Sequence, residues 1–435
     1  MRILLVSFAF PPFNDIGHVR VGKTAKYLHK FGHDVRVLSA SDQPYLPSLD
    51  VEIPEENILR TPWWNVNKPA EFMFGGRHAV ADRGLVAKGR VRPLVESIRW
   101  LYRHTYKQWV GFPDDFIGWA PFAVRAGTEL LTHWRPDVIY ASAMPYTSLV
   151  VAAKLARQFQ VPWVAELRDL WVDFHRYRFG RWRKRAESIL ERWVLSSASG
   201  LVTVSEPLAA TLRAKFSKPT AVVLNGFDAV VRAHTSQLDP KPGVLRIVYT
   251  GMIYEGRQDP TPLFAALRAM GPDAAEIRVE FYGRYLESAR EAAARYGLTN
   301  VVLGGQVPYA QSLSLQHGAD VLLLLLWTDQ RERGVYTGKL FEYVGAGRPI
   351  LAIGPEGNVA SNLIKERNLG SVCGDAVSTQ RQLEMWLAVK RMNETLVTPS
   401  LEAREGLSRE AQTRVLETFL TQLVDPSSNA NSRHQ

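Results

Sequence analysis

Short apolar runs alternate with segments of helical periodicity through most of the chain. Six such runs in the first half contain few polar residues, which is typical of parallel strands buried on both faces. They are ILLVSFAF (3–10), DVRVLSA (34–40), DVIYASA (137–143), PWVAEL (162–167), GLVTVS (200–205) and VVLNGFD (222–228). Segments with helical periodicity lie between them, for example at 21–32 and 148–159. This alternation predicts a parallel α/β fold.

The pattern restarts after a polar, proline-containing stretch, HTSQLDPKPG (234–243). The later runs are LRIVYTG (245–251), IRVEFYG (277–283), VVLGG (301–305), DVLLLLLW (320–327) and PILAIG (349–354). We therefore expect two doubly wound, Rossmann-like domains at 1–230 and 245–400, joined by a linker at 231–244. The remaining residues predict a C-terminal helix at 401–424 and, from their polar composition, a disordered tail at 425–435.

Residues 56–130 interrupt the alternation. Tryptophans stand here among arginines and lysines, and a second cluster of this kind, HRYRFGRWRKRAESILERW, occupies 175–193. Basic residues beside aromatic ones are typical of a surface that binds an anionic bilayer. Other interpretations stay open: the tryptophans belong to the core, or the charges form an ordinary solvated face. Nucleic acid is not an expected partner, because no nucleic-acid-binding motif accompanies the charge.

The composition of the chain indicates its class of partner and its compartment. The chain of 435 residues has a formal net charge of +10, which favours anionic partners. No apolar run approaches the roughly 18–20 residues that span a bilayer. The opening MRILLVSFAF runs directly into Pro11 and Pro12 without a small-residue cleavage site, so we interpret it as a buried strand rather than a signal peptide. The single cysteine, Cys373, cannot form an intrachain disulfide, which fits a reducing cytosol.

The stretch GVYTGKLFEYVGAG (334–347) is the strongest candidate for a ligand site. If a helix starts near Thr337, the amides of Val335 to Gly338 point toward its N-terminal side, where the helix dipole favours a phosphate. Lys339 in the first turn opposes that dipole unless a bound anion compensates it. Glu342 lies one turn later and suits the two hydroxyls of a ribose. The alternative is an intrahelical Lys339–Glu342 ion pair.

Other candidates follow predicted strands, where open α/β sheets bind their ligands. Gly17 either lets a phosphate approach the backbone or forms a simple turn. Arg257 either meets a ligand or pairs with Asp259. Three more residues follow a strand of the first domain and either face a ligand or cap and pair locally; they are Glu166, Arg168 and Asp169. We expect no metal site, because the histidines lack a ligand spacing and one cysteine cannot build a zinc site.

Taken in order, these pieces resemble the family-4 type of retaining glycosyltransferases, which have the GT-B fold, and more closely the bacterial surface-polysaccharide branch. The likeness extends over nearly the whole chain and rests on the order and spacing of its segments. These are 10–39, GFPDDFIGWAPFA (111–123), PWVAELRDLW (162–171), LVTVSEPLA (201–209), LNGFD (224–228), YTGMIYEGRQDP (249–260), EFYGR (280–284), GKLFEYVGAGRPILAIG (338–354) and the last helix.

The resemblance implies a cleft between two domains, with the nucleotide sugar mainly on the C-terminal domain and the acceptor on the N-terminal one. It also implies that the last helix crosses back to the N-terminal domain. On the donor side it implies that Glu342 grips the ribose and that positive groups meet the phosphates. The donor-binding residues are then Gly17, Gly251, Val335, Tyr336, Thr337, Gly338 and Glu342. The catalytic residues are Arg257, Lys339, Asp169 and Glu166. The acceptor-side residues are Arg168 and His18, with Asp169 and Glu166 as candidates for orienting the acceptor.

The chain departs from the family pattern at three positions. Gly334 stands eight residues before Glu342, where the family has a glutamate that usually contacts the sugar; Glu332 is nearby. Arg168 replaces a histidine that is common after the domain-one strand. Met252 replaces the first basic residue of domain two.

We therefore expect a metal-independent, retaining hexosyl- or N-acetylhexosaminyltransferase. It would use a UDP- or GDP-linked sugar, need no other cofactor, and extend a lipid-linked or surface polysaccharide precursor such as capsule, O-antigen or exopolysaccharide. We expect it in the cytoplasm, peripherally bound to the anionic inner face of the cell membrane. Two alternatives stay open: a nucleotide-sugar epimerase of similar fold, and a degenerate scaffold that binds nucleotide sugar or glycan.

Overall fold

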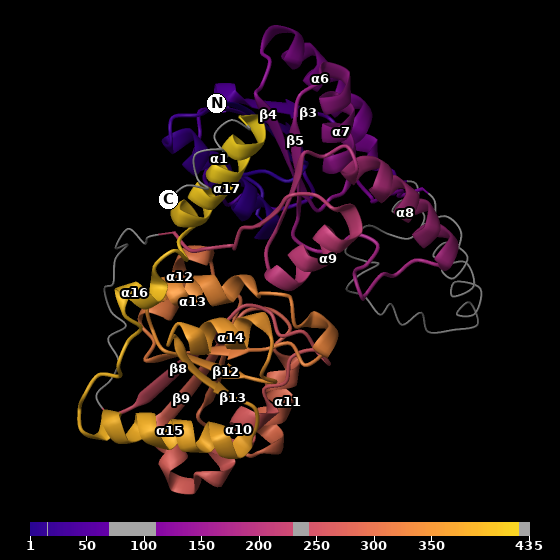
Figure 1. Ribbon diagram of the computed structural model, residues 1–435. Helices are drawn as coiled ribbons and strands as arrows, with labels where there is room; N and C mark the ends of the chain where they lie inside the picture. Colours follow the sequence, from indigo (N-terminus) through magenta and orange to yellow (C-terminus); the bar gives the residue numbers. More distant parts are fainter. Residues whose placement is uncertain (15, 69–109, 229–242, 426–435) are drawn as a thin grey trace, which may run out of the picture. The chain divides into compact units, whose positions relative to one another are not determined.

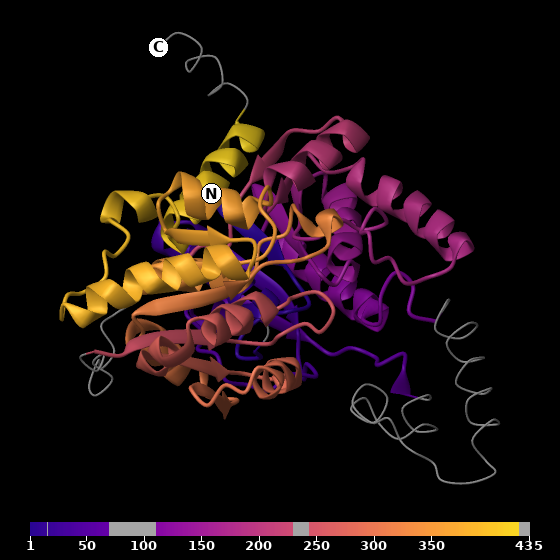
Figure 2. The same cartoon turned by 90° about the horizontal axis from the view of Figure 1, so that it is seen from below.

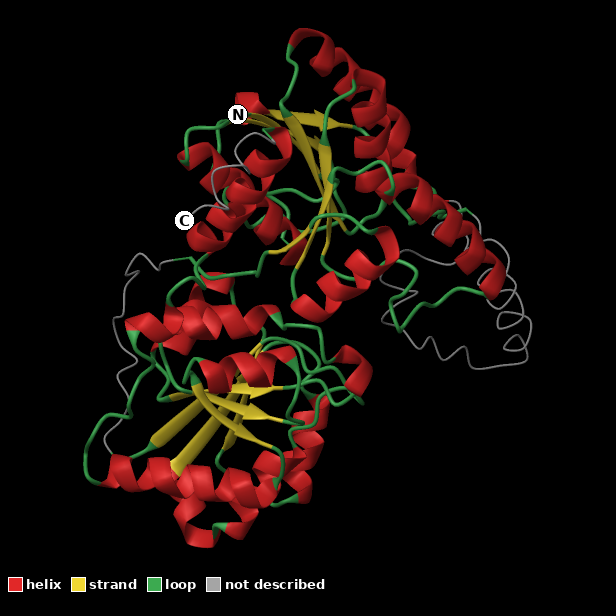
Figure 3. Cartoon of the chain, viewed as in Figure 1, coloured by secondary structure: helices red, strands yellow, loops and turns green. Residues whose placement is uncertain are grey.

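The chain, a computed structural model, is described at residues 1–14, 16–68, 110–228 and 243–425. It divides into two compact units, each with one parallel sheet and helices on both of its faces (Figure 3). Unit 1 comprises Met1–Val223 and Thr413–Gln435, and unit 2 comprises Leu224–Gln412. Most of the expected linker at 231–244, nearly all of the expected tail, and the middle of the expected insertion lie outside the described residues.

Unit 1 is built on a seven-stranded sheet in the order β3-β2-β1-β4-β5-β6-β7, with every neighbouring pair parallel (Figure 1). The strands are β1 (Arg2–Val6), β2 (Asp34–Ala40), β3 (Ile58–Thr61), β4 (Val138–Ala143), β5 (Trp163–Leu167), β6 (Gly200–Thr203) and β7 (Thr220–Val222). Its helices are α1 (Ile16–Lys30), α6 (Ala120–His133), α7 (Thr147–Phe159), α8 (Arg181–Leu195), α9 (Glu206–Phe216) and most of α17 (Arg409–Val424).

Alternating residues of the strands fill a separate hydrophobic cluster on each face of this sheet. On β1, Leu4 and Val6 face one cluster, and Ile3 and Leu5 face the other. All four side chains have no measurable exposure. Burial on both faces explains why the strands read as continuous apolar runs.

The structure corrects several expected boundaries in unit 1. β1 ends at Val6 rather than Phe10, and α1 begins at Ile16 rather than near Val19. The edge strand β7 ends at Val222, so it precedes most of the expected strand 222–228. The expected insertion at 56–130 is shorter than predicted, because β3 and α6 at its two ends belong to the sheet unit.

Unit 2 has a six-stranded parallel sheet in the order β10-β9-β8-β11-β12-β13. The strands are β8 (Leu245–Thr250), β9 (Ile277–Tyr282), β10 (Val301–Gly305), β11 (Val321–Leu325), β12 (Ile350–Ile353) and β13 (Gly370–Cys373). The helices are α10 (Thr261–Ala269), α11 (Glu287–Arg295), α12 (Tyr309–His317), α13 (Gly338–Ala346), α14 (Val359–Glu366), α15 (Ala376–Arg391) and α16 (Leu401–Arg404). The single helix expected at 401–424 is instead two helices, α16 and α17, separated by residues 405–408.

The order of the strands fixes where ligands can bind. The chain reverses its direction of winding beside β1 in unit 1 and beside β8 in unit 2. In such sheets the crevice outside the carboxyl ends of the strands at the reversal point holds the ligand. The loops after β8 and β11 therefore flank the candidate site of unit 2, and the loops after β1, β4 and β5 flank that of unit 1. No helix in the described part of the chain is both long and apolar enough to cross a membrane.

Candidate functional site

The N-terminus of α13 is the centre of the candidate site in unit 2. The helix begins at Gly338 with Thr337 as its N-cap, close to the start expected from the sequence. Thr337 makes no side-chain capping bond, and its buried hydroxyl has no hydrogen-bond partner among the described residues. The amide of Leu340 donates to the carbonyl of Thr337 at 3.2 Å, whereas the amides of Gly338 and Lys339 precede the first intrahelical acceptor. This end of α13 therefore offers two amide donors beside the positive end of the helix dipole.

Lys339 reaches from the first turn of α13 back to the end of β8. Its Nζ donates hydrogen bonds to the hydroxyl of Tyr249 and to the carbonyl of Met252, the second at 2.9 Å. It also lies 4.2 Å from the centre of the Tyr249 ring. Gly251 makes this approach possible, because a Cβ at that position would lie 2.3 Å from the Lys339 Cε. Both residues expected here as donor-binding are thus in contact.

The environment of Lys339 favours its neutral form. Burial lowers the pKa of the Lys339 amine to about 7, while the charge of Glu342 acts weakly in the opposite direction. In the described part of the chain its hydrogen bonds go to Tyr249 and Met252 rather than to a carboxylate. The alternative of an intrahelical Lys339–Glu342 ion pair is therefore wrong. An incoming anion would favour the charged form of this amine and so bind beside it.

Glu342 lies one turn further along α13, against α12. The amide Nε2 of Gln316 donates to its Oε2 at 3.3 Å and to the hydroxyl of Thr250 at 2.9 Å. Burial raises the pKa of the Glu342 carboxyl, whereas Gln316, Arg409 and Tyr309 lower it. Gln316 itself is completely buried. The carboxylate is therefore oriented by two side chains of α12, Gln316 and Tyr309, and it has no ion pair to a lysine in the described part of the chain.

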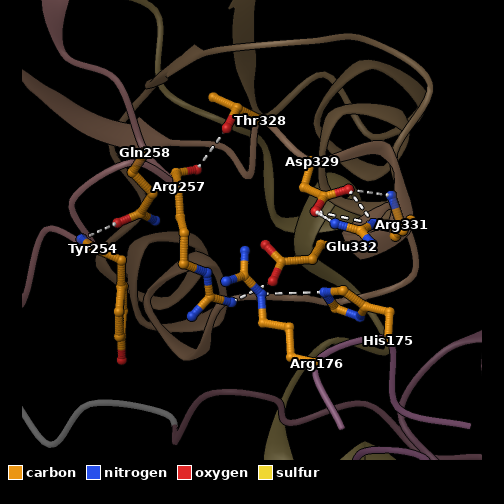
Figure 4. A network of polar contacts seen from close by, with 9 residues as sticks. All are labelled: His175, Arg176, Tyr254, Arg257, Gln258, Thr328, Asp329, Arg331 and Glu332. Atoms are coloured by element: carbon orange, nitrogen blue, oxygen red, sulfur yellow. Dashed lines mark hydrogen bonds and ion pairs between the residues drawn. The ribbon is translucent and has the colours of Figure 1, made fainter. Parts of the chain in front are cut away.

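Arg257 follows β8, and the sequence left open whether it meets a ligand or pairs with Asp259. In the structure its partner is Glu332. The Nη2 of Arg257 donates to Oε1 of Glu332 (Figure 4). Its guanidinium also stacks 4.3 Å from the ring centre of Trp327. Glu332 is 1% exposed. Asp259, the partner considered from the sequence, instead accepts the amide of Thr261 at 2.8 Å. Arg257 therefore lies beside the loop that leads to α13, but a buried carboxylate partly neutralises it.

The Arg257–Glu332 contact shows what Glu332 does in the loop next to Gly334. The expected sugar-reading glutamate is absent at that position, and the nearby Glu332 lies in a short 3-10 turn (Gln330–Glu332) that Asp329 caps at the amide of Arg331. The amide of Val335 donates to the carbonyl of Glu332 at 2.9 Å. Glu332 thus shapes the backbone that leads to α13 and holds Arg257.

In unit 1, Gly17 and Arg168 are in direct contact. A Cβ at Gly17 would lie 2.8 Å from Nη1 of Arg168. Arg168 donates through Nε to the carbonyl of Ala143 at 2.7 Å, so it lies across the carboxyl end of β4. Asp169 is half-buried at the end of β5, where its charge helps to raise the pKa of Tyr146, after burial as the larger cause. These three residues mark the ligand edge of this sheet.

Glu166 and His18 have structural surroundings instead. Glu166 is 1% exposed and accepts Nε and Nη2 of the buried Arg20 at 2.9 and 2.6 Å, as well as the hydroxyl of Ser142 at 2.5 Å. The opposite charge of Arg20 and these hydrogen bonds hold the pKa of Glu166 low against burial. His18 is also 1% exposed, and its Nε2 lies 2.6 Å from Oε1 of Gln43. Both side chains are buried and hydrogen-bonded in unit 1, and the roles expected for them stay predictions.

Some residues of these sites were not predicted from the sequence. Gln316 orients Glu342 from 26 positions away, and Tyr249 holds Lys339 from 90 positions away. Glu332 and Arg257 are 75 positions apart. The only signal for Gln316 in the sequence is a polar residue near the end of a helix that leads into a strongly apolar strand. Within the described residues no group of three or more His, Cys, Asp or Glu side chains is placed to hold a metal ion.

Comparison with known proteins agrees with this architecture. Residues 17–226 match the family model described as a glycosyl transferase 4-like domain. No curated protein sequence matches the chain. This part of the chain is therefore similar to a glycosyl transferase 4-like domain.

Solved structures resemble the chain over almost its whole length. Sucrose-phosphate synthase from Thermosynechococcus elongatus has a TM-score of 0.60 at 16% identity, over 97% of this chain and 99% of that one. A trehalose-6-phosphate structure from E. coli bound with UDP-2-fluoro glucose has a TM-score of 0.58 at 14% identity, over 98% and 99%. Anabaena HepE in complex with UDP and glucose has a TM-score of 0.52 at 16% identity, over 100% of both chains. The expected α/β fold of GT-B type is thereby confirmed.

Proposed function

We propose that this chain is a glycosyltransferase that takes its sugar from a nucleoside diphosphate sugar bound to unit 2. The observation that carries the proposal is the N-terminus of α13. There, within the described part of the chain, the buried Thr337 hydroxyl has no hydrogen-bond partner and the amine of Lys339 has no carboxylate partner, and both stand at the positive end of the helix dipole. Such an arrangement suits a diphosphate. Glu342, one turn on, has the position and the acceptors to bind a ribose diol.

The residues around α13 would act by stabilising the negative charge of the leaving group. As the bond between the anomeric carbon and the phosphate oxygen breaks, negative charge grows on the departing diphosphate. The α13 amides and Lys339 stabilise that charge, with a smaller contribution from Arg257 because Glu332 offsets it. In a transfer with retention the acceptor oxygen attacks from the face that the diphosphate leaves, and the leaving phosphate takes the proton of the acceptor hydroxyl. We therefore assign no protein nucleophile and no metal ion to the reaction.

We assign the acceptor to unit 1, at the carboxyl ends of β1, β4 and β5. Arg168 and Asp169 are the residues we expect it to meet. A lipid-linked or surface polysaccharide precursor is the acceptor class that fits best, because unit 1 carries the aromatic and basic cluster at 175–193. On this proposal the protein works as a cytoplasmic enzyme at the membrane surface.

The first test is nucleotide binding. Calorimetric titration with UDP and GDP should show binding of at least one of them. The change Glu342→Ala should weaken it by roughly ten- to a hundredfold, because hydrogen bonds to a charged group are lost. Glu384→Ala removes an exposed helical glutamate of the same unit and should leave affinity unchanged.

Equal affinity of the Glu342 variant and the wild type would show that α13 is not the nucleotide site. Binding of nucleotide without consumption of the matching nucleotide sugar, with any glycan or lipid-linked acceptor, would contradict the transferase assignment. Turnover of the nucleotide sugar without any acceptor would point to an epimerase instead.

A further inference from the structure

Helix α8 buries several charged side chains and exposes large apolar ones, whereas most surface helices do the opposite. Its inward face carries charged residues: Arg183, Glu187 and Glu191 are each 2% exposed or less. Its outward face carries three of the most exposed large apolar side chains of unit 1. They are Trp182 at 70%, Ile189 at 67% and Trp193 at 44% exposure.

Ion pairs and hydrogen bonds anchor the inward face, together with the buried Val194 and Leu195 at its end. Arg183 donates to Glu187 at 2.6 Å and to the carbonyls of Gly111 and Pro113 at 2.5 and 3.0 Å. The indole of Trp171 donates to the other oxygen of Glu187 at 3.1 Å. Because these contacts are specific and buried, α8 cannot turn its apolar side inward without breaking them.

The exposed apolar residues form one continuous stripe. With 3.6 residues per turn, Trp182, Ile189 and Trp193 fall within about 40° of one another around the helix axis. In two views at right angles, α8 extends from the body of unit 1 (Figures 1 and 2). The guanidinium of Arg157 from α7 stacks 3.7 Å from the ring centre of Trp193, which holds that indole in place.

The charges that border this stripe have one sign. Arg181, Arg185 and Arg192 are all exposed and lie within about 120° of the stripe on one side. The two acidic residues of α8, Glu187 and Glu191, are both buried. The outer face of α8 therefore combines a tryptophan-rich apolar strip with three cationic side chains and no exposed carboxylate.

We propose that the outer face of α8 docks unit 1 onto an anionic lipid bilayer. Indole and isoleucine side chains at the level of the headgroups bury their apolar area, and the flanking arginines meet lipid phosphates. A nucleic acid would use the charges but leave the stripe in water, and a second copy of the chain would bring three further cations to the same place. The anionic bilayer satisfies both features. The biological role of this docking rests on the proposed lipid-linked acceptor, but the docking itself requires neither donor nor acceptor.

The test is sedimentation of the full chain with vesicles of phosphatidylcholine alone and of phosphatidylcholine mixed with phosphatidylglycerol. We expect binding to the anionic vesicles and little to the neutral ones, weakening as salt is raised. The double change Arg181→Gln and Arg185→Gln should lower the partition constant roughly 25-fold, at about fivefold for each charge. Its matched control, Arg268→Gln with Arg295→Gln, removes two exposed helical arginines of unit 2 and should have little effect.

The apolar stripe is tested separately. Trp182→Ser with Ile189→Ser should lower partition by about tenfold or more. Leu46→Ser with Trp64→Ser changes residues of unit 1 that are 76% and 66% exposed but lie outside α8, and should change it little. Equal loss in both pairs, or no loss in either, would overturn the proposal. Charge-dependent binding that ignores the Trp182 and Ile189 changes and is matched by duplex DNA would show a nucleic-acid surface instead.

A label at position 189 reports directly on what covers α8. Since Cys373 is the only cysteine and is buried, Ile189→Cys accepts a polarity-sensitive dye selectively. Its emission should shift to the blue only when anionic vesicles are added. A blue-shifted emission already present without vesicles would mean that another part of the chain, or a second copy, covers the face, and would overturn the proposal. Nucleotide titration of the same samples separates this result from failure of the transferase assignment, because donor binding belongs to unit 2.

Discussion

At the scale of single residues, the approach of Lys339 to β8 depends on the absence of a side chain at position 251. Gly251 has a φ of 120°, which side chains rarely allow, and a Cβ there would collide with the lysine. The lysine consequently loses water and gains two neutral partners, Tyr249 and Met252. Its low pKa follows from this exchange.

We expect nucleotide binding to be coupled to proton uptake at Lys339. With a pKa of about 7, the free amine is mostly neutral at pH 8, and a bound diphosphate favours its charged form. Titrations at pH 8 in buffers of different ionisation enthalpy should give uptake of about 0.9 proton per site. The change Lys339→Met should abolish the uptake and weaken binding. Arg257→Gln should weaken binding and leave the uptake in place; proton-independent binding by the wild type would contradict the assignment.

The same pKa has a consequence for stability in the absence of nucleotide. The folded pKa of Lys339 lies below the unfolded value of 10.5. Between these two values the unfolded chain binds more protons, so the contribution of Lys339 to stability increases as pH rises from about 7 toward 10.5. A bound diphosphate that raises the folded pKa should reduce this dependence.

The residues of the site were predictable to the extent that they are local in sequence. The start of α13, its glycines and Glu342 lie within one short segment, and their pattern alone indicates a phosphate-binding helix. The partners of those residues come from distant segments. The spacing of Arg257 and Glu332 in the sequence does not predict their contact. From the sequence alone, Glu166 is a carboxylate at the end of a strand, and its ion pair with Arg20 is known only from the structure.

At the scale of secondary-structure elements, the loop before α6 caps a helix from a distance. Asp114 accepts the amide and the hydroxyl of Thr147 at the start of α7, both at 2.8 Å, and the amide of Phe116 at 3.0 Å. The adjacent carbonyls of Gly111 and Pro113 accept Arg183 from α8. One loop thus ties the start of α7 to α8, the helix with the outward apolar stripe.

This cap predicts a pH dependence of stability. Burial raises the pKa of Asp114 to about 6, although its hydrogen bonds to Thr147 act in the opposite direction. Between 3.8 and about 6 the folded state binds the additional proton, so stability should increase as pH falls through this range, by at most about 1.4 kcal/mol per pH unit. Urea denaturation from pH 7 to pH 4 should show this slope in the wild type relative to Asp114→Asn.

The neighbouring carboxylate supplies the control for that experiment. Asp115 adds only a minor charge effect to Asp114, so Asp115→Asn should keep most of the slope. A slope that survives in Asp114→Asn would assign the pH dependence to other groups.

Elements differ in how clearly the sequence marks them. The long apolar runs of β4 and β11 are unmistakable, because both of their faces are buried. The edge strand β13 reads Gly-Ser-Val-Cys and is mostly half-buried, so it has no apolar run to detect. Similarly, β3 has four residues and two half-buried positions, and its tryptophan-rich surroundings resemble an insertion. Edge strands bury less, and their pattern is correspondingly weak.

At the scale of the whole molecule, the two units should respond unequally to nucleotide. If the donor binds to unit 2 alone, it stabilises that unit by about 2.7 kcal/mol at a hundred times the dissociation constant. Hydrogen exchange should then slow in peptides from β8, β11 and α13, and remain nearly unchanged in peptides from β2 and β6. Protection confined to unit 1 would place the nucleotide there and contradict the assignment.

The division into units also has a consequence for synthesis. Unit 1 is discontinuous: its last piece, from Thr413 onward, is separated from Val223 by the whole of unit 2. Leu416 and Leu420 of that piece are completely or almost completely buried in the same cluster as Ile3 and Leu5. A ribosome delivers the first residues of this core long before the last ones. During that interval one flank of the first sheet remains uncovered, so its final packing waits until the second unit has left the ribosome.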